Sequence, residues 1–289
     1  MSRIALGTVQ FGVPYGIANK LGQVSRAEAK LILQQAYAHK IDTIDTAIGY
    51  GESESCLGEA GVNDFKLITK LPAIPDGCVD IKKWVEQQLE ASLSRLGVSK
   101  VYGFLFHRPE QLLGLNGNIL YEVLQRLKER GMVKKIGISI YSPNDLELLT
   151  NNFHFDLVQA PFNIFDRRLF GTGWMQQLKD SGVEIHTRSA FLQGLLLMKQ
   201  VAIPPKFLPW NGIFRKWHDW LNENNISALQ ASLAFPLSFP QVDRVVVGVD
   251  SQSQLLQIVS AENEPINTDL PNLASEDENL INPANWSKL

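Results

Sequence analysis

The sequence predicts an α/β fold of the (β/α)8 or TIM barrel class, with long loops at the C-terminal face of the barrel. Eight short apolar runs rich in β-branched residues alternate with helical patterns along the chain. Continuous apolar strands that alternate with helices are typical of a parallel sheet buried on both faces. The chain has 289 residues, of which 45% are hydrophobic, so a single domain spanning residues 1–289 can bury a core of barrel size.

The predicted strands are short and are bounded by turn or helix signals. They cover residues 4–8, 43–47, 66–70, 101–107, 135–140, 155–160, 183–188 and 244–248. The clearest helical patterns cover residues 26–39, 84–96, 119–130, 143–150, 174–181 and 255–260. Ser25 is the predicted N-cap of the first helix, with Glu28 as the partner in a capping box. Gly97, Gly131 and Gly182 follow three helices as predicted C-cap glycines.

Three segments fall outside this alternation. Residues 108–118 and 190–225 are too long for ordinary barrel turns, and loops at the C-terminal face usually shape a substrate pocket. Residues 262–289 are polar and contain three prolines, so we expect a C-terminal tail that lies over the surface. Five aromatic residues of the second segment are expected to pack a helix onto the barrel rather than to line the pocket: Phe207, Trp210, Phe214, Trp217 and Trp220.

Charge and composition argue against several classes of protein. The net charge is −3 with a pI near 6.0, and no basic block marks a nucleic-acid surface. Cys56 and Cys78 lack the spacing of a metal knuckle or a disulfide framework, and His154 and His186 lack partners at metal-ligand spacing. The start of the chain lacks the features of a signal peptide, and no apolar run approaches the roughly 20 residues of a membrane span. We therefore expect a cytoplasmic protein that holds no metal and acts on a small molecule; its oligomeric state is not indicated.

Four strand-end residues indicate an enzyme. Asp45, Tyr50, Lys70 and His107 stand at or just past the downstream ends of successive apolar runs. In a parallel barrel, side chains at the C-terminal strand ends converge on one mouth. Taken singly, each residue has an ordinary alternative role. Asp45 could cap the following helix and Tyr50 could be a loop aromatic, whereas Lys70 could be a solvated strand end and His107 a core histidine. Together, an acid, a phenol, an amine and an imidazole are the groups needed to protonate a carbonyl oxygen, which favours the catalytic interpretation.

Seven segments resemble, in order and spacing, the motifs of the aldo-keto reductase family. They are LGTVQFG, IDTIDTAIGYGESESCLGEA, FKLITKL, FLFHRP, KKIGISIY, FDLVQAPFNIFDRR and RSAFLQGLL. The resemblance spans residues 4 to about 260, and it implies a nicotinamide cofactor across the barrel mouth and reduction of an aldehyde or ketone. It also matches Asp45, Tyr50, Lys70 and His107 to the family's catalytic tetrad without substitution.

The chemistry of such a tetrad follows from the charge that develops on the substrate. Hydride delivered to a carbonyl carbon leaves negative charge on oxygen, which a positioned acid must neutralise. A free tyrosine has a pKa of about 10, and we expect the Lys70 ammonium to lower the pKa of Tyr50. Asp45 is expected to keep Lys70 charged and oriented, and His107 is expected to hydrogen-bond the carbonyl oxygen.

The resemblance also implies contacts to the nicotinamide. Ser139 and Gln159 match the family's polar contacts to the carboxamide, whereas Ile140 replaces an asparagine that usually follows the serine. Arg188 stands where the family commonly has a tyrosine stacked on the nicotinamide. A guanidinium plane can stack on a flat ring. Because its positive charge would repel the oxidised nicotinamide ring, such stacking would bias the site towards the reduced cofactor. An ion pair with a carboxylate or a place in the substrate pocket are the alternatives for Arg188.

The remaining cofactor positions follow the seventh and eighth predicted strands. The stretch that contacts the pyrophosphate matches Ser189, Phe191, Gln193 and Gly194, and the adenosine-phosphate site corresponds to Gly248, Asp250, Ser251, Gln254 and Gln257. Members that select a 2′-phosphate usually place Lys or Arg at this second site, because a dianion favours charge-assisted hydrogen bonds. Here these positions are neutral or, at Asp250, negative. NADP(H) is therefore expected on family grounds, and NAD(H) stays open.

The expected function is NAD(P)H-dependent reduction of an aldehyde or ketone to an alcohol, with the proton from Tyr50. The segment ALGTVQFGVPYGIANKLGQ resembles family members of bacterial surface-sugar pathways, which makes a sugar-derived carbonyl compound a candidate substrate. Two alternatives stay open. The departures at Ile140 and Arg188 would suit a nicotinamide-binding redox sensor or regulatory module with little turnover. A cofactor-independent lyase or isomerase would fit the same barrel.

Overall fold

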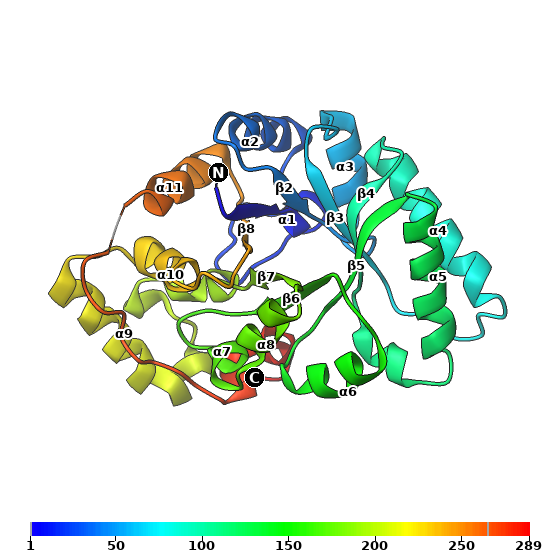
Figure 1. The fold of residues 1–289 in the computed structure, drawn as a ribbon. Helices are drawn as coiled ribbons and strands as arrows, with labels where there is room; N and C mark the ends of the chain where they lie inside the picture. The colour runs from blue at the N-terminus through cyan, green and yellow to red at the C-terminus, as the bar shows by residue number, and fades with distance from the viewer. Residues whose placement is uncertain (1, 265) are drawn as a thin grey trace.

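The computed structural model describes residues 2–264 and 266–289, and its centre is a closed barrel of eight parallel strands (Figure 1). The strands are β1 (Ile4–Gly7), β2 (Thr43–Asp45), β3 (Lys66–Leu71), β4 (Val101–Phe106), β5 (Val133–Ser139), β6 (Leu157–Pro161), β7 (Glu184–Arg188) and β8 (Arg244–Gly248). Each strand pairs with the next along the chain, and β8 pairs with β1 to close the sheet. The predicted barrel is confirmed, because each of the eight apolar runs forms one strand.

Helices surround the barrel, as the ribbon in Figure 1 shows. They are α1 (Val9–Gly12), α2 (Arg26–Ala38), α3 (Ser53–Ala60), α4 (Ile81–Leu96), α5 (Gly117–Glu129), α6 (Asn144–Asn152), α7 (Arg168–Gly171), α8 (Trp174–Asp180), α9 (Asn211–Asn224), α10 (Ala228–Leu237), α11 (Gln252–Glu262) and α12 (Glu278–Ile281). The six predicted helices are confirmed, and the others are additional. Across the described residues, no helix is both long and apolar enough to cross a membrane.

The predicted helix ends are confirmed except in one respect. The Ser25 hydroxyl accepts a hydrogen bond from the Glu28 amide at 3.2 Å. Gly97, Gly131 and Gly182 have φ angles of 67°, 75° and 74°, in the left-handed region that favours glycine. The capping box is wrong, because the Glu28 carboxylate accepts from the Gln252 amide at 2.6 Å and so joins α2 to α11.

The long connection between β7 and β8 is largely helical. It contains the 3-10 segments η2 (Leu192–Leu197), η3 (Gln200–Ala202) and η4 (Pro205–Trp210), followed by α9. Its aromatic residues pack onto the barrel, as predicted. Phe207, Phe214 and Trp217 are buried, and Trp217 stacks on Trp220 with ring centroids 6.1 Å apart. The other long connection, after β4, contains η1 (Pro109–Leu113) and continues into α5.

The C-terminal segment runs over the surface of the barrel and is anchored by a few buried side chains. It forms α12 and η5 (Pro283–Lys288), and Leu273, Leu280, Ile281 and Trp286 are buried. Trp286 is only 4% exposed and packs edge-on against Phe207 with centroids 4.9 Å apart. Its indole nitrogen donates to the Leu280 carbonyl at 3.1 Å, and Lys206 donates to the Trp286 carbonyl at 2.8 Å. A few apolar residues spaced among polar ones anchor this segment, which its polar composition alone did not indicate.

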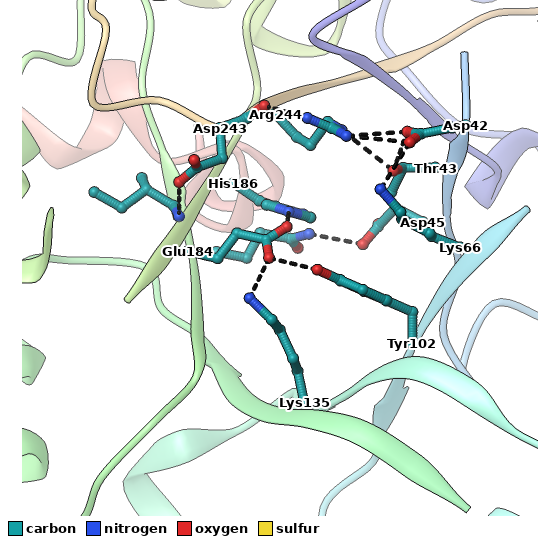
Figure 2. Close-up of polar contacts among 12 residues, drawn as sticks. Asp42, Thr43, Asp45, Lys66, Tyr102, Lys135, Glu184, His186, Asp243 and Arg244 are labelled. Carbon is teal, nitrogen blue, oxygen red and sulfur yellow. Dashed lines mark hydrogen bonds and ion pairs between the residues drawn. The ribbon is translucent and has the colours of Figure 1, made fainter. Parts of the chain in front are cut away.

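A polar network fills the barrel interior near the N-terminal strand ends (Figure 2). Glu184 accepts hydrogen bonds from the Tyr102 hydroxyl at 2.8 Å and from the Lys135 ammonium. Its other carboxylate oxygen lies 2.7 Å from Nε2 of His186, which is fully buried. His186 is therefore a core residue of the barrel, and this end of the barrel is held together by its own ion pairs.

Candidate active site

A cavity of about 1090 Å³ opens at the C-terminal ends of the strands. Most of the predicted site residues line it: Asp45, Tyr50, His107, Ser139, Gln159, Arg188, Ser189, Phe191, Gln193, Gly194, Gly248, Asp250, Gln254 and Gln257. Two do not, because Lys70 is fully buried without reaching the cavity and Ser251 caps α11. The sheet register accounts for the convergence, since it pairs Gly7 with Asp45 and Pro161 with Arg188 at the same end of the barrel.

Asp45 and Lys70 form a buried ion pair at the ends of β2 and β3. The Lys70 ammonium donates to Oδ1 of Asp45 at 2.6 Å and to the Thr46 carbonyl at 2.9 Å. Gln159 Nε2 donates to the other Asp45 oxygen at 2.7 Å. Burial lowers the pKa of Lys70, and the Asp45 carboxylate opposes that effect. Both carboxylate oxygens are thus held by donors from β3 and β6.

Tyr50 lies in the turn after β2, where two glycines allow segments of the chain to approach closely. A Cβ on Gly12 would lie 1.6 Å from the Tyr50 carbonyl oxygen, and a Cβ on Gly51 would lie 2.6 Å from the Gly12 carbonyl oxygen. The Tyr50 ring packs edge-on against His107 with centroids 5.6 Å apart. The Lys70 ammonium lies 5.1 Å from the Tyr50 ring centroid. Tyr50 and His107 therefore share one wall of the cavity, with Lys70 next to the tyrosine ring.

The electrostatics of Tyr50 differ from the expectation. Burial raises the pKa of its phenol, the Asp45 carboxylate raises it further, and the Arg188 guanidinium opposes both. The expected lowering by Lys70 is wrong for this structure, because the Asp45 carboxylate at 2.6 Å offsets the ammonium charge. The phenol stays protonated at neutral pH, which is the form that an acid catalyst requires.

His107 is neutral at physiological pH. Burial lowers its pKa to about 3, and the positive charges of Lys70, Arg188 and Arg108 contribute to the shift. A neutral imidazole has one N–H donor and no charge. It can hydrogen-bond a carbonyl oxygen next to Tyr50 without competing with the phenol as the proton source.

Ser139 and Gln159 lie side by side at the ends of β5 and β6, where they are partners in the sheet register. The Ser139 hydroxyl donates to Gln159 Oε1 at 3.3 Å, and Gln159 Nε2 is bound to Asp45. A primary amide has two N–H donors and two acceptor sites, so Gln159 keeps one of each for a ligand. The Ile140 side chain is fully buried and does not line the cavity, so it offers no contact in place of the asparagine of the family pattern.

Arg188, at the end of β7, turns toward the segment that follows β5. Its guanidinium donates to the Ile140 carbonyl at 2.9 Å and to the Ser189 hydroxyl at 3.3 Å. The guanidinium carbon lies 4.7 Å from the centroid of the Tyr141 ring, and that of Arg108 lies 5.4 Å from the same centroid. Among residues 2–264 and 266–289, no carboxylate pairs with Arg188. The ion-pair alternative for Arg188 is therefore not what this structure forms.

The backbone after β7 has an uncommon conformation. Ser189, Leu192, Gln193 and Gly194 have φ angles of 62°, 48°, 54° and 89°. Residues of this kind within a turn can direct backbone amides to one concave side, a shape that suits phosphate groups. Gln193 Nε2 donates to the Tyr15 hydroxyl at 3.1 Å, which joins this turn to the loop before α2. The turn lines the cavity, and it is the segment that could hold a cofactor pyrophosphate.

The cavity beside α11 carries charges of both signs. Asp250 accepts a hydrogen bond from Asn19 Nδ2 at 3.2 Å, and the Asp250 amide donates to Gln254 Oε1 at 2.7 Å. Lys20, the next residue after Asn19, also lines the cavity. The Ser251 hydroxyl accepts from the Gln254 amide at 3.3 Å, so its role is to cap the helix. These residues could hold the adenosine half of a dinucleotide.

Among the cavity residues that were not predicted from the sequence are Tyr15, Lys20, Arg108 and Tyr141. Arg108 directly follows His107, and Tyr141 is two residues past Ser139. Their positions at strand ends are a signal that could have identified both. Tyr15 and Lys20 belong to the loop before α2, which reaches the cavity only through tertiary contacts.

Comparisons with known proteins agree with this geometry. The sequence profile described as the Aldo/keto reductase family matches residues 3–271. An uncharacterized oxidoreductase of Bacillus subtilis, YqkF, is 23% identical over 283 residues, which cover 91% of this chain and 88% of the relative. An L-glyceraldehyde 3-phosphate reductase of Escherichia coli O157:H7 is 24% identical over 288 residues, which cover 86% of this chain and 83% of the relative.

A solved structure is similar in fold. An aldo-keto reductase of Bacillus halodurans, in its holo form, matches with a TM-score of 0.75 and 19% identity, covering 96% of this chain and 94% of that one. At this identity the likeness concerns the fold alone.

Proposed function

Because this chain belongs to the aldo/keto reductase family, whose members are oxidoreductases of carbonyl substrates, we propose that it reduces an aldehyde or ketone to an alcohol with Tyr50 as the proton donor. One observation carries the proposal. The protonated phenol of Tyr50 and the neutral imidazole of His107 meet in the cavity at a centroid distance of 5.6 Å, with the Asp45–Lys70 ion pair next to them.

The roles of the four residues follow from their contacts. Tyr50 gives its proton to the carbonyl oxygen as negative charge develops there, and His107 donates a hydrogen bond that orients the same oxygen. A reduced nicotinamide, when bound, supplies the hydride. Loss of the proton leaves a phenolate on Tyr50, which the Arg188 guanidinium stabilises, while the Lys70 ammonium lies 5.1 Å from the ring centroid with its charge offset by Asp45. Asp45 holds Lys70 in that position through the 2.6 Å ion pair.

The cofactor of this proposal is NADP(H) on family grounds, with NAD(H) as the alternative. Ser139 and Gln159 would hold the carboxamide, and the turn at Ser189–Gly194 would hold the pyrophosphate. At the adenosine end, Lys20 favours a 2′-phosphate and Asp250 disfavours one, so the balance of these two charges sets the preference.

A sugar-derived carbonyl compound is the proposed substrate class. The loop before α2 carries the sequence resemblance to family members of surface-sugar pathways, and its residues Tyr15, Asn19 and Lys20 line the cavity. The relative named L-glyceraldehyde 3-phosphate reductase is consistent with a substrate of this class.

Steady-state oxidation of NADPH and of NADH, with a panel that includes glyceraldehyde and aromatic aldehydes, tests the proposal. We expect many turnovers per enzyme molecule with at least one aldehyde and their loss in Tyr50→Phe. Tight cofactor binding without turnover on any aldehyde would instead favour the redox sensor. A protein that binds neither cofactor in a fluorescence titration would refute the proposed function.

A further inference from the structure

Two guanidinium groups converge on one aromatic ring in the cavity. The Tyr141 ring lies 4.7 Å from the guanidinium carbon of Arg188 and 5.4 Å from that of Arg108. Arg188 comes from the end of β7, and Arg108 directly follows His107 at the end of β4. All three residues line the cavity together with Tyr50 and His107. The pair of arginines is therefore next to the proposed reaction centre.

Among the described residues, Arg108 and Arg188 are the two arginines that line the cavity, and neither has an anionic partner; Arg126 and Arg215, which also have none, are exposed outside it. Arg26, Arg95, Arg130, Arg168 and Arg244 each pair with a carboxylate. Arg3 and Arg167 donate to backbone carbonyls. In the structure as described, neither Arg108 nor Arg188 forms an ion pair, and the Arg108 guanidinium has no hydrogen-bond acceptor from the protein. The Arg108 donors, and those Arg188 donors that do not bind Ile140 and Ser189, remain available to a ligand.

The carboxylates of the cavity do not neutralise this pair. Asp45 is bound to Lys70 at 2.6 Å, and Asp250 lies at the adenosine end, where it binds Asn19. Arg188 reaches across β6 to the Ile140 carbonyl, away from β8 and the adenosine end. The positive charge is thus concentrated on the β4–β5 side of the cavity, the side that holds His107.

We propose that Arg108 and Arg188, set on the Tyr141 ring, bind an oxyanion carried by the carbonyl substrate, either a carboxylate or a phosphate. The inference rests on the proposed function, because it names the substrate class of the same site. Guanidinium groups suit this role, since their planar forks donate two hydrogen bonds to a carboxylate or phosphate. An anionic group held there would fix the distance between the substrate's carbonyl oxygen and Tyr50.

Matched substrate pairs test the inference. To test for a carboxylate (the carboxylate arm), kcat/KM is measured for 4-carboxybenzaldehyde and for its neutral methyl ester. To test for a phosphate (the phosphate arm), kcat/KM is measured for glyceraldehyde 3-phosphate and for glyceraldehyde. We expect the wild type to prefer the anionic member of at least one pair by about tenfold or more, since a charge-assisted hydrogen bond is worth that much. The arm that shows the preference identifies the oxyanion.

Variants connect the preference to the two arginines. Arg108→Gln and Arg188→Gln should each lower the ratio of anionic to neutral kcat/KM by about tenfold or more. Arg108→Lys should retain part of the preference, because it keeps the charge and loses the fork. Arg126→Gln, on the exposed surface of α5, removes the same net charge far from the cavity and should leave the ratio unchanged. Raised ionic strength should reduce the wild-type ratio.

Several results would overturn the inference. If the wild type turns over both members of each pair equally, the oxyanion site is refuted but the proposed function is not. A loss of cofactor affinity in Arg108→Gln, with the substrate ratio unchanged, would assign the arginine to the cofactor. A binding measurement independent of turnover completes the test: calorimetry with the product 4-(hydroxymethyl)benzoate and its methyl ester. Equal affinities for these two, together with equal affinities for glycerol 3-phosphate and glycerol, would exclude an oxyanion site even if no aldehyde is reduced.

Discussion

Replacing Tyr50 with phenylalanine should abolish most of the activity and leave the fold intact. The substitution removes one hydroxyl, which donates no hydrogen bond to any described residue. The aromatic ring, which packs against His107 at 5.6 Å and lies 5.1 Å from the Lys70 ammonium, is retained. Because no buried partner loses its hydrogen bond, the free energy of unfolding should change by no more than about 0.5 kcal/mol.

The catalytic loss should be much larger than the loss of stability. General acid catalysis by a positioned side chain contributes about 10²–10⁴-fold to a rate, so kcat in Tyr50→Phe should fall by about that factor. Cofactor affinity should be nearly unchanged, because only the transition state requires the proton. The same reasoning gives a pH profile. The rate of reduction should be flat from about pH 5 to about pH 8, since the phenol loses its proton only as pH rises through a raised pKa and His107, with a pKa of about 3, gains one only in acid.

Single-turnover measurement of nicotinamide oxidation gives the chemical rate, and urea denaturation of the same preparations gives the stability. The m-value should be equal in the two proteins, because the surface exposed on unfolding is the same. Retention of more than about a tenth of the wild-type rate would refute Tyr50 as the acid. A wild-type rate that falls steeply between about pH 6 and pH 8 would show that the phenol titrates near neutrality, contrary to its burial.

Three further predictions concern stability and cofactor choice. Lys70→Met should lower the free energy of unfolding by about 3–5 kcal/mol, because it leaves the Asp45 charge buried without its partner. The double variant Lys70→Met/Asp45→Leu should recover part of that loss, as measured by urea denaturation. Equal losses in the two variants would contradict the coupling between Lys70 and Asp45. The pKa of His107 is about 3 in the folded protein and about 6.5 in the unfolded chain, so the unfolded state takes up the proton first as the pH falls. The free energy of unfolding should therefore decrease by at most about 1.4 kcal/mol for each pH unit of acidification between about pH 6.5 and about pH 3. His107→Gln should lack this component, and the difference between the two pH–stability curves measures it. Asp250→Asn should increase the affinity for NADPH relative to NADH, as measured by fluorescence titration, because it removes a negative charge from the adenosine end; an unchanged ratio would place Asp250 away from the 2′ position.

The barrel could be predicted from the sequence because its strands are buried on both faces. Each apolar run is short and continuous, and burial forces that pattern on a parallel strand. The helix ends were predictable because caps depend on residues within one turn of the helix end, as Ser25 and Gly97 show. Convergence of Asp45, Tyr50 and His107 on one cavity followed from the fold once the strand ends were known.

Contacts between distant side chains could not be predicted in this way. The α3 segment begins Ser-Glu-Ser and looks solvated, yet Glu54 is only 1% exposed. Its carboxylate accepts hydrogen bonds from Thr69 and Ser92, both at 2.6 Å, and from Arg95. Only the fold brings these donors together, so no local pattern marks the burial.

The predicted direction of the pKa shift of Tyr50 was wrong for a related reason. The sequence indicates that an ammonium is near the phenol, but the sign of the shift depends on which groups lie closest. In the structure the Lys70 charge is offset by Asp45 at 2.6 Å, and the cation that opposes the effect of burial is Arg188. A prediction of this kind requires the positions of the charges to within a few ångströms, because the Coulomb energy varies inversely with distance.

The charges of the barrel interior are arranged differently at its two ends. Toward the N-terminal ends of the strands, Lys66 and Arg244 pair with Asp42 and Lys135 pairs with Glu184, so each cation has a carboxylate.

At the opposite end Lys70 has such a partner, but Arg108 and Arg188, which line the cavity, have none within the described chain. Arg108 is exposed to water, but Arg188 is half-buried and has lost part of its hydration, a cost that the negative charge of a ligand would offset. The chain as a whole carries a net charge of −3, which makes a local excess of positive charge at the mouth a property of the site and not of the composition. Such a field raises the local concentration of anions and speeds their association. Association of an anionic substrate should therefore slow as salt is added, whereas the chemical step, enclosed with Tyr50 and the Asp45–Lys70 pair, should not.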